Sequence, residues 1–178
     1  IESELGAPLE EVFESVEEVA VAGASMAQVH FAVLKETGES VAIKVLRPGL
    51  EKIVEADFDI LMWFARQAHE HLEELKPFDL PGVAETLRKG MEKELDFRYE
   101  ARNMAFFALQ NPYPEAVHVP KVYEDYSSKC VLVMERIDGR RMSDLEPDSE
   151  EAKRVAIEGS QSLFHQILIT GFFHADPH

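Results

Sequence analysis

The chain has 178 residues and a formal net charge of −16, from 18 Lys and Arg against 34 Asp and Glu. This balance argues against a nucleic-acid groove, because nothing in the sequence would neutralise a phosphate backbone. The single cysteine, Cys130, excludes an internal disulfide framework and is expected to be a buried thiol. No apolar stretch approaches about 18 residues, and Ile1–Glu4 carries no basic region, so neither a spanning helix nor a signal peptide is predicted.

A strand, a turn and a second strand are predicted between residues 25 and 46. Gln28–Val33 is rich in β-forming residues, and Glu36–Glu39 has turn composition. In the second strand, the β-branched residues Val41, Ile43 and Val45 alternate with Ala42, Lys44 and Leu46. Because side chains alternate across a strand, Ala42 and Lys44 share one face.

The rest of the chain is predicted to contain three long helices and two further strands. Helical spacing of apolar residues continues from Leu50 to Leu75, and a second helix begins near Asp79 and Pro81 and runs to about Leu109. Strand character then covers residues 117–126 and 129–137, and a last helix covers about residues 149–170 before Gly171. These elements predict an α+β fold with an antiparallel sheet.

A run of small residues precedes the strand pair. Residues 22–29 have the spacing G-x-G-x-x-G-x-V of a kinase phosphate loop, with Ala22, Ala24 and Ala27 at the glycine positions and Val29 at the valine. Small residues there let backbone N–H groups approach phosphate oxygens. A tight hairpin without a ligand has a similar composition, so the interpretation depends on the nearby Lys44.

Lys44 needs a partner if its strand faces inward, because burial disfavours an unpaired charge. A solvated lysine on an edge strand is the simpler alternative. Glu92, Asp96 and Glu100 recur every four residues, which on one continuous helix would place three carboxylates on one face. Such a stripe is either solvated or faces a cation, and Lys44 is the candidate cation.

The last five residues carry His174, Asp176 and His178. A metal site with nitrogen and oxygen ligands and an exposed loop without function are two possible interpretations. The interpretation that we favour is that Asp176 is a hydrogen-bonding or proton-accepting residue beside a transferring phosphoryl group.

Several motifs occur in order along nearly the whole chain, and together they resemble the UbiB (AarF-type) atypical kinases linked to ubiquinone biosynthesis. They are residues 5–13, the alanine-rich loop at 22–30, VAIKV with RPG at 41–49, ELDFRYEA at 94–101, VLVME at 131–135 and HADPH at 174–178.

The resemblance implies a kinase-like small lobe over residues 1–137, with an inserted helix at about 50–75 and an αC-like helix at about 80–109. Residues 138–178 would be the hinge, the first helix and the start of the catalytic loop of a large lobe that is truncated here. The implied catalytic residues are Lys44, Glu100 as its helix partner, and Asp176. The implied nucleotide contacts are Ala22, Ala24, Ser25, Ala27, Val29, Ala42, Lys44, Met134, Glu135 and Ile137, and the implied regulatory E-x-D pair is Glu94 and Asp96.

The resemblance also implies ATP and Mg²⁺ as cofactors, with the metal ligands beyond His178, and a peripheral membrane location for the full-length protein. Isoprenoid lipid precursors and quinone-biosynthesis enzymes are the implied partners. Gly23 interrupts the alanine run, and the family's lysine-glycine-glutamine element is missing, which removes the expected cationic partner of Glu94. Two other functions remain open, a non-catalytic scaffold gated by ATP and a small-molecule phosphotransferase. We expect residues 1–178 alone to be inactive.

Overall fold

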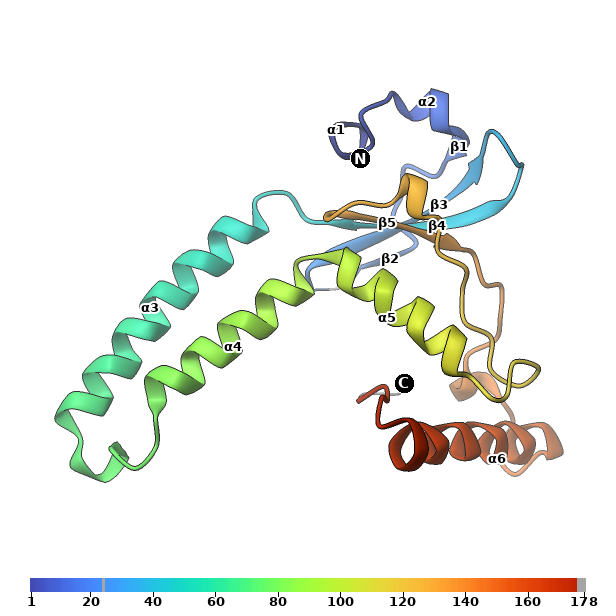
Figure 1. Cartoon of the computed structure of the whole chain (residues 1–178). Coiled ribbons are helices and arrows are strands. Elements are labelled where there is room, and N and C mark those ends of the chain that lie inside the picture. The colour runs from blue at the N-terminus through green and yellow to red at the C-terminus, as the bar shows by residue number, and fades with distance from the viewer. Residues whose placement is uncertain (24, 176–178) are drawn as a thin grey trace.

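The computed structural model describes residues 1–23 and 25–175 (Figure 1). The strands are β1 Phe13–Val16, β2 Ala22–Gly23, β3 Ala27–Leu34, β4 Ser40–Leu46 and β5 Val131–Glu135. The helices are α1 Glu2–Leu5, α2 Leu9–Val12, α3 Leu50–His71, α4 Leu80–Glu94, α5 Phe97–Gln110 and α6 Glu150–His165. Short 3-10 turns occupy Glu73–Leu75, Glu124–Tyr126 and Met142–Asp144, and one π-type turn, Gln166–Thr170, continues α6.

All five strands form one antiparallel sheet in the order β1-β3-β4-β5, with β2 pairing the other end of β3. The predicted strand pair is the centre of this sheet, where Val29 lies opposite Lys44 and Phe31 lies opposite Ala42. On the other side of β4, Lys44 lies opposite Leu132 and Ala42 lies opposite Met134. The predicted α+β class with an antiparallel sheet is confirmed.

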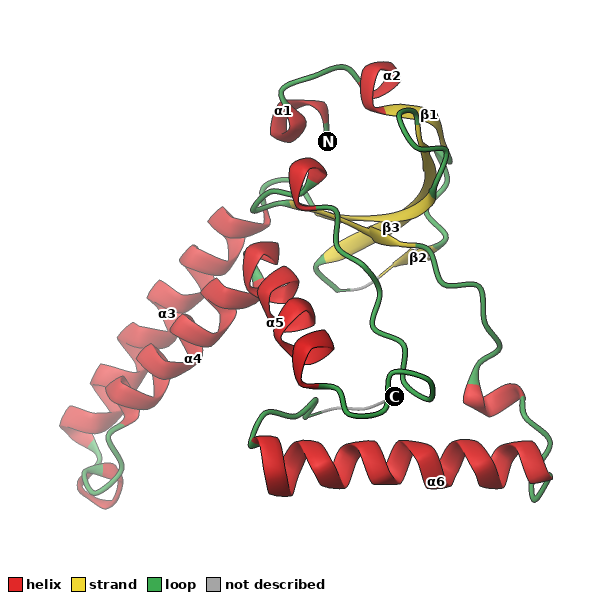
Figure 2. Cartoon of the chain, turned by 45° about the vertical axis from the view of Figure 1, so that its right-hand side comes forward, coloured by secondary structure: helices red, strands yellow, loops and turns green. Residues whose placement is uncertain are grey.

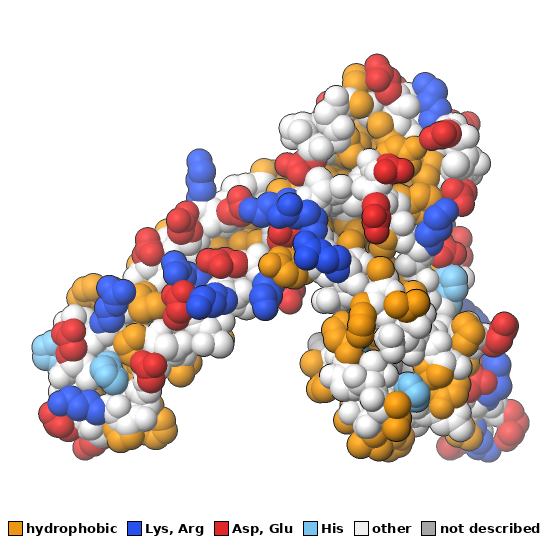
Figure 3. Space-filling view, viewed as in Figure 1, with side chains coloured by type: hydrophobic (Ala, Val, Ile, Leu, Met, Phe, Trp, Pro, Cys, Tyr) orange, Lys and Arg blue, Asp and Glu red, His pale blue; other side chains and the backbone are white. Residues whose placement is uncertain are grey.

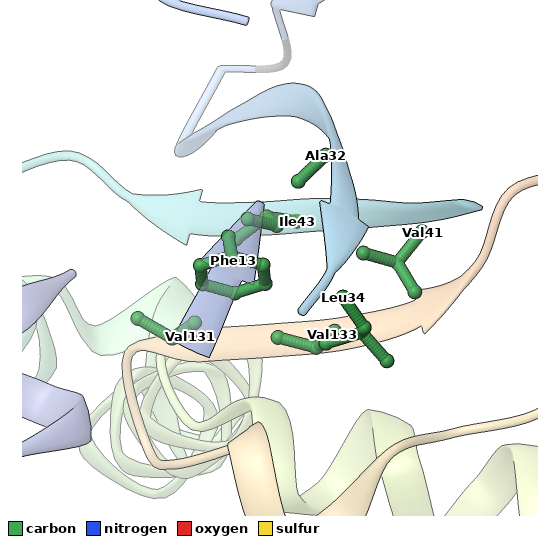
Figure 4. Close-up of a cluster of buried hydrophobic side chains, with 7 residues drawn as sticks. All are labelled: Phe13, Ala32, Leu34, Val41, Ile43, Val131 and Val133. Atoms are coloured by element: carbon green, nitrogen blue, oxygen red, sulfur yellow. The ribbon is translucent and has the colours of Figure 1, made fainter. Parts of the chain in front are cut away.

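Side chains pack against both faces of the sheet. Because successive residues of β4 point to opposite faces, they belong to two different clusters. On one face Val41 and Ile43 are fully buried with Leu34, Val131 and Val133, and Phe13 and Ala32 complete this cluster (Figure 4). Helices α1 and α2 contribute Leu5, Leu9 and Val12 around it. On the opposite face, Ala27, Leu46 and Leu132 pack against Leu95 and Phe97 at the start of α5.

Helices α3 and α4 form an arm that extends away from the sheet, and α5 turns back beneath it (Figures 1 and 2). None of the residues of α3 is fully buried, and side chains such as Ile60, Trp63 and Phe64 are more than half exposed. Figure 3 shows hydrophobic side chains on the arm and around the C-terminal helix. Within the described residues, no helix is long and apolar enough to cross a membrane.

The prediction of one helix from about residue 80 to 109 is wrong. Helix α4 ends at Glu94, and α5 begins at Phe97 after Leu95 and Asp96. Asp96 has extended backbone angles and its side chain accepts a hydrogen bond from Arg98 N–H, so it is the N-cap of a new helix. Leu95 and Phe97 are buried, which shows that tertiary packing turns the chain at this corner.

The predicted strand at residues 117–126 is also absent. This segment forms one isolated bridge, Val122 to Met134, followed by a 3-10 turn. Pro120 has no N–H to give to a ladder, so pairing with β5 is limited to a few backbone bonds such as Tyr123 N–H to Val133 O at 2.9 Å. The strands β1 and β2 were not predicted, because they have only four and two residues.

The two other helices lie where they were predicted. The 50–75 helix is α3 with a 3-10 turn after it, and the 149–170 helix is α6 with its π-type continuation. Ser149 caps α6 by accepting a bond from Ala152 N–H, and Gly171 ends the π-type turn at φ 69°.

Replacing Ile43 by Ala should reduce the free energy of unfolding by about 2–5 kcal/mol, because the side chain is fully buried and a cavity would remain. Urea denaturation measures this change. Ile60→Ala is the matched control: this isoleucine is 56% exposed, and its replacement should change stability by no more than about 0.5 kcal/mol. Equal effects of the two changes would contradict the assignment of the core.

Candidate functional site

The best-defined polar contact on the face of the sheet that packs against α5 joins Lys44 of β4 to Glu100 of α5. Lys44 Nζ donates to Glu100 Oε2 at 2.7 Å and to Oε1 at 2.9 Å. The lysine side chain is 24% exposed and the glutamate side chain 37%, so the pair lies at the edge of the core. The predicted pairing of Lys44 with Glu100 is therefore present, and the solvated edge-strand alternative is excluded.

The residues opposite Lys44 and Ala42 form an apolar patch around this ion pair. Val29 lies opposite Lys44 on β3, and Met134 lies opposite Ala42 on β5, both half-buried. Ala42 is 6% exposed. The structure thus brings four of the predicted nucleotide contacts, Val29, Ala42, Lys44 and Met134, onto one sheet face.

The alanine-rich loop lies next to this patch. Ala22 is in β2 opposite Val29, and both Ala22 and Ser25 are exposed, whereas Ala27 is only 2% exposed and belongs to the core. Ala24 lies outside the described residues. A Cβ built on Gly23 would lie 3.8 Å from Arg47 Nη2, so this guanidinium is beside the loop.

Glu135 and Ile137 are at the end of β5 and just after it. The Glu135 carboxylate is already engaged: its Oε2 accepts from Lys121 N–H at 3.1 Å and from His118 Nε2 at 2.8 Å. These hydrogen bonds hold the pKa of Glu135 below its ordinary value, and the bond from the Lys121 backbone has the largest effect. Ile137 is half exposed. The backbone groups of Glu135 and Ile137 stay the predicted contacts of the adenine base.

Asp96 and Glu94 do not lie side by side, because the helix breaks between them. Asp96 is 7% exposed, and its Oδ2 lies 2.7 Å from Arg98 Nη2. Hydrogen bonding by the Arg98 side chain lowers the pKa of Asp96 from its usual 3.8, although burial opposes this change. Glu94 is exposed at the end of α4.

The predicted stripe of three carboxylates is therefore wrong. Asp96 pairs with Arg98, and Glu92 is exposed on α4 with its Oε1 4.0 Å from Arg88 Nε. Only Glu100 reaches Lys44. The spacing rule failed because it requires one continuous helix, and the N-cap at Asp96 starts a second helix with a new direction.

The catalytic-loop candidate Asp176 and the neighbouring His178 lie outside the described residues, so their roles stay predictions. His174 is described, and its backbone N–H donates to Gln166 Oε1 at 3.3 Å. Over residues 1–23 and 25–175, no group of three or more His, Cys, Asp and Glu is arranged to hold a metal ion.

Sequence reasoning missed four side chains around the site, Phe31, Phe97, Arg98 and Arg136. Phe97 lies with its ring centroid 5.0 Å from Lys44 Nζ, and the guanidinium of Arg136 lies 3.9 Å from the ring centroid of Phe31, opposite Ala42. Phe31 could have been found, because it shares the alternation of Val29. Phe97 and Arg98 could not have been found, because residues 95–96 include no proline or glycine from which a break in the helix could be predicted.

Replacing Asp96 by Asn should lower the free energy of unfolding at pH 7 by about 1 kcal/mol, since asparagine keeps the cap but loses the charge-assisted bonds to Arg98. The folded-state pKa is depressed, so this stabilisation is present above about pH 4 and is lost as the pH falls through the folded pKa. The difference between the two proteins should therefore narrow toward about pH 2.

Urea denaturation across this pH range measures the effect. Asp79→Asn is the control, because Asp79 also caps a helix, through Gly82 N–H at 3.1 Å, and no basic side chain of the described residues forms an ion pair with it. If the difference in free energy of unfolding between the wild type and Asp96→Asn became larger in acid, the charged carboxylate would not be the stabilising form.

Known proteins resemble this chain over its whole length. The family model described as the ABC1 atypical kinase-like domain matches residues 1–178. A probable protein kinase UbiB from Shewanella loihica is 40% identical over 187 residues, and others from Aeromonas hydrophila and Erwinia tasmaniensis are each 38% identical over 184 and 181 residues. In each case the match covers all of this chain and 33% of the relative, so the chain spans about a third of these relatives. The chain belongs to the ABC1 atypical kinase-like family.

Proposed function

We propose that this chain supplies the nucleotide site of an atypical kinase or ATPase of the UbiB type. The observation that carries the proposal is the Lys44–Glu100 ion pair, which holds an ammonium at the edge of an apolar sheet face. A lysine positioned in this way by a helix glutamate is the group that contacts nucleotide phosphates in kinases. Its surroundings fit both halves of a nucleotide, a cation for the phosphates and an apolar surface for the base.

The proposed roles follow from this placement. Lys44 stabilises phosphate charge, and Glu100 fixes the direction of the ammonium. Val29, Ala42 and Met134 contact the base, while backbone groups of Glu135 and Ile137 bond to its edge. The backbone of residues 22–27, including Ala22, Ala24, Ser25 and Ala27, lies along the phosphates. Arg47 provides a second cation beside the same loop.

Magnesium would supply positive charge that offsets the charge of the phosphates during transfer. Its proposed ligands lie beyond His178, and Asp176 is proposed to act as the catalytic-loop aspartate. Residues 1–137 are proposed to be the small lobe and residues 138–178 the start of the large one. Glu94 and Asp96 are proposed as a regulatory pair in which Asp96 sets the corner before α5 and Glu94 is free of core contacts.

The biological role proposed for the whole protein is support of isoprenoid quinone biosynthesis at a membrane surface. This part of the proposal comes from the resemblance to the UbiB kinases and from the name of the relatives, probable protein kinase UbiB. Lipid precursors and quinone-biosynthesis enzymes are the proposed partners of the full-length protein.

Lys44→Ala in the full-length protein should lower the rate of ATP turnover by about 10²–10³-fold, because a preorganised cation at the phosphates is removed. Lys52→Ala is the matched control, since Lys52 is an exposed lysine of α3. Thermal unfolding of both variants checks that they fold. Turnover unchanged in Lys44→Ala would reject the proposed site, and ATP binding without turnover in the wild type would favour the scaffold function instead.

Glu100→Gln should leave a lysine at the site but release its orientation, since an amide has one acceptor oxygen in place of two. A displaced charge of this kind costs about 10²-fold in rate, so turnover should fall. The loss of thermal stability should be modest, because the two side chains of the pair are 24% and 37% exposed. Glu92→Gln is the control, because Glu92 is exposed and does not reach Lys44. Similar turnover in the two variants would show that Glu100 does not orient the lysine.

A further inference from the structure

Lys44 has a second partner, the aromatic ring of Phe97. The lysine Nζ lies 5.0 Å from the ring centroid, while the Glu100 oxygens lie at 2.7 and 2.9 Å. A cation within about 6 Å of a ring centroid and over its face is attracted by the negative potential of the ring. The ammonium is therefore held by a carboxylate and by a ring at the same time.

Phe97 is held firmly in place. Its side chain is 3% exposed and packs with Leu132, which lies opposite Lys44 in the sheet. Its backbone N–H donates to Lys129 O at 2.9 Å, which ties the first residue of α5 to the segment leading into β5. The ring thus has a fixed position relative to the strand that carries Lys44.

Phe97 and Glu100 are three residues apart on α5, so they lie on neighbouring positions of one helix face. One helix therefore presents both partners of the lysine, and a shift of α5 would change both contacts together. An aliphatic side chain would fill the same core position without attracting the ammonium.

We infer that Phe97 is a positioning residue of the proposed nucleotide site, whose ring face holds the Lys44 ammonium beside Glu100. The inference rests on the proposed function for its consequence, which is correct placement of the lysine at the phosphates. The contact joins two side chains of this chain, so it can be measured without activity.

The sharpest test changes the electronics of the ring and keeps its shape. Site-specific incorporation of 3,4,5-trifluorophenylalanine at position 97 of the full-length protein removes most of the negative potential of the ring face. The measurement is the rate at which an N-hydroxysuccinimide ester labels Lys44 at fixed pH, followed by mass spectrometry of the Lys44 peptide. We expect labelling to become at least about threefold faster than in the unsubstituted protein, because the Lys44 amino group leaves the ring more often and is then accessible to the ester.

Three comparisons complete the test. Phe97→Leu should make labelling faster than the fluorinated ring does. Phe97→Tyr should keep the slow rate of the unsubstituted protein, because it keeps an electron-rich ring. Trifluorophenylalanine at position 106 is the matched control: Phe106 is on the same helix, is 44% exposed and pairs with Phe172. Its substitution should leave Lys44 labelling unchanged. Thermal unfolding identifies any variant that fails to fold. If Phe97→Leu or Phe97→Tyr fails to fold, the labelling rate of the protein with the fluorinated ring decides the test.

Equal labelling rates with and without fluorine at position 97 would overturn the inference, as would equal acceleration from position 106. Protection of wild-type Lys44 by Mg-ATP is measured alongside and tests the proposed function by itself. Protection by Mg-ATP combined with no effect of fluorine would reject the role of Phe97 and keep the nucleotide site. Faster labelling with fluorine but no protection would support the ring contact and reject the nucleotide site.

Discussion

The ion pair between Lys44 and Glu100 is the constraint on which the arrangement of the chain depends. A lysine in the middle strand of a covered sheet requires an anion, because burial without a partner disfavours its charge. The anion comes from a residue 56 positions later, so the chain must leave the sheet, form the arm and return with Glu100 facing β4. The path of α3 and α4 away from the sheet and of α5 back beneath it satisfies this requirement (Figure 2).

The corner at Leu95 and Asp96 makes that return possible. If α4 and α5 were one straight helix, it would continue along the arm and could not lie under the sheet. Asp96 caps the new helix and is held by Arg98, while Leu95 and Phe97 are buried against Leu132 and Ala27. Burial and capping at these residues thus stabilise the direction of α5, and through it the position of Glu100 four residues later.

The sequence predicted the elements whose signals are local and repeated. The alternation around Lys44, the helical spacing of α3 and the motif order were enough to predict the sheet, two helices and the pairing of Lys44 with Glu100. It did not predict the corner, because Asp96 looks like one more acidic residue in a helical pattern until its tertiary contacts are known. The irregular segment before β5 was missed because Val119 and Val122 have strand propensity, while Pro120 removes a donor that a ladder needs.

The distribution of burial also separates a rigid part of the molecule from a loosely packed one. The strands around Lys44 include six side chains that are fully buried, whereas α3 contains none that is buried. Local opening is expected where few apolar contacts are buried, so the arm is the less stable part. It joins α5 through Leu95, Asp96 and Phe97, which are 5, 7 and 3% exposed. The corner therefore joins α4 to the helix whose ring and carboxylate hold Lys44, and it is the physical link between the arm and the proposed site.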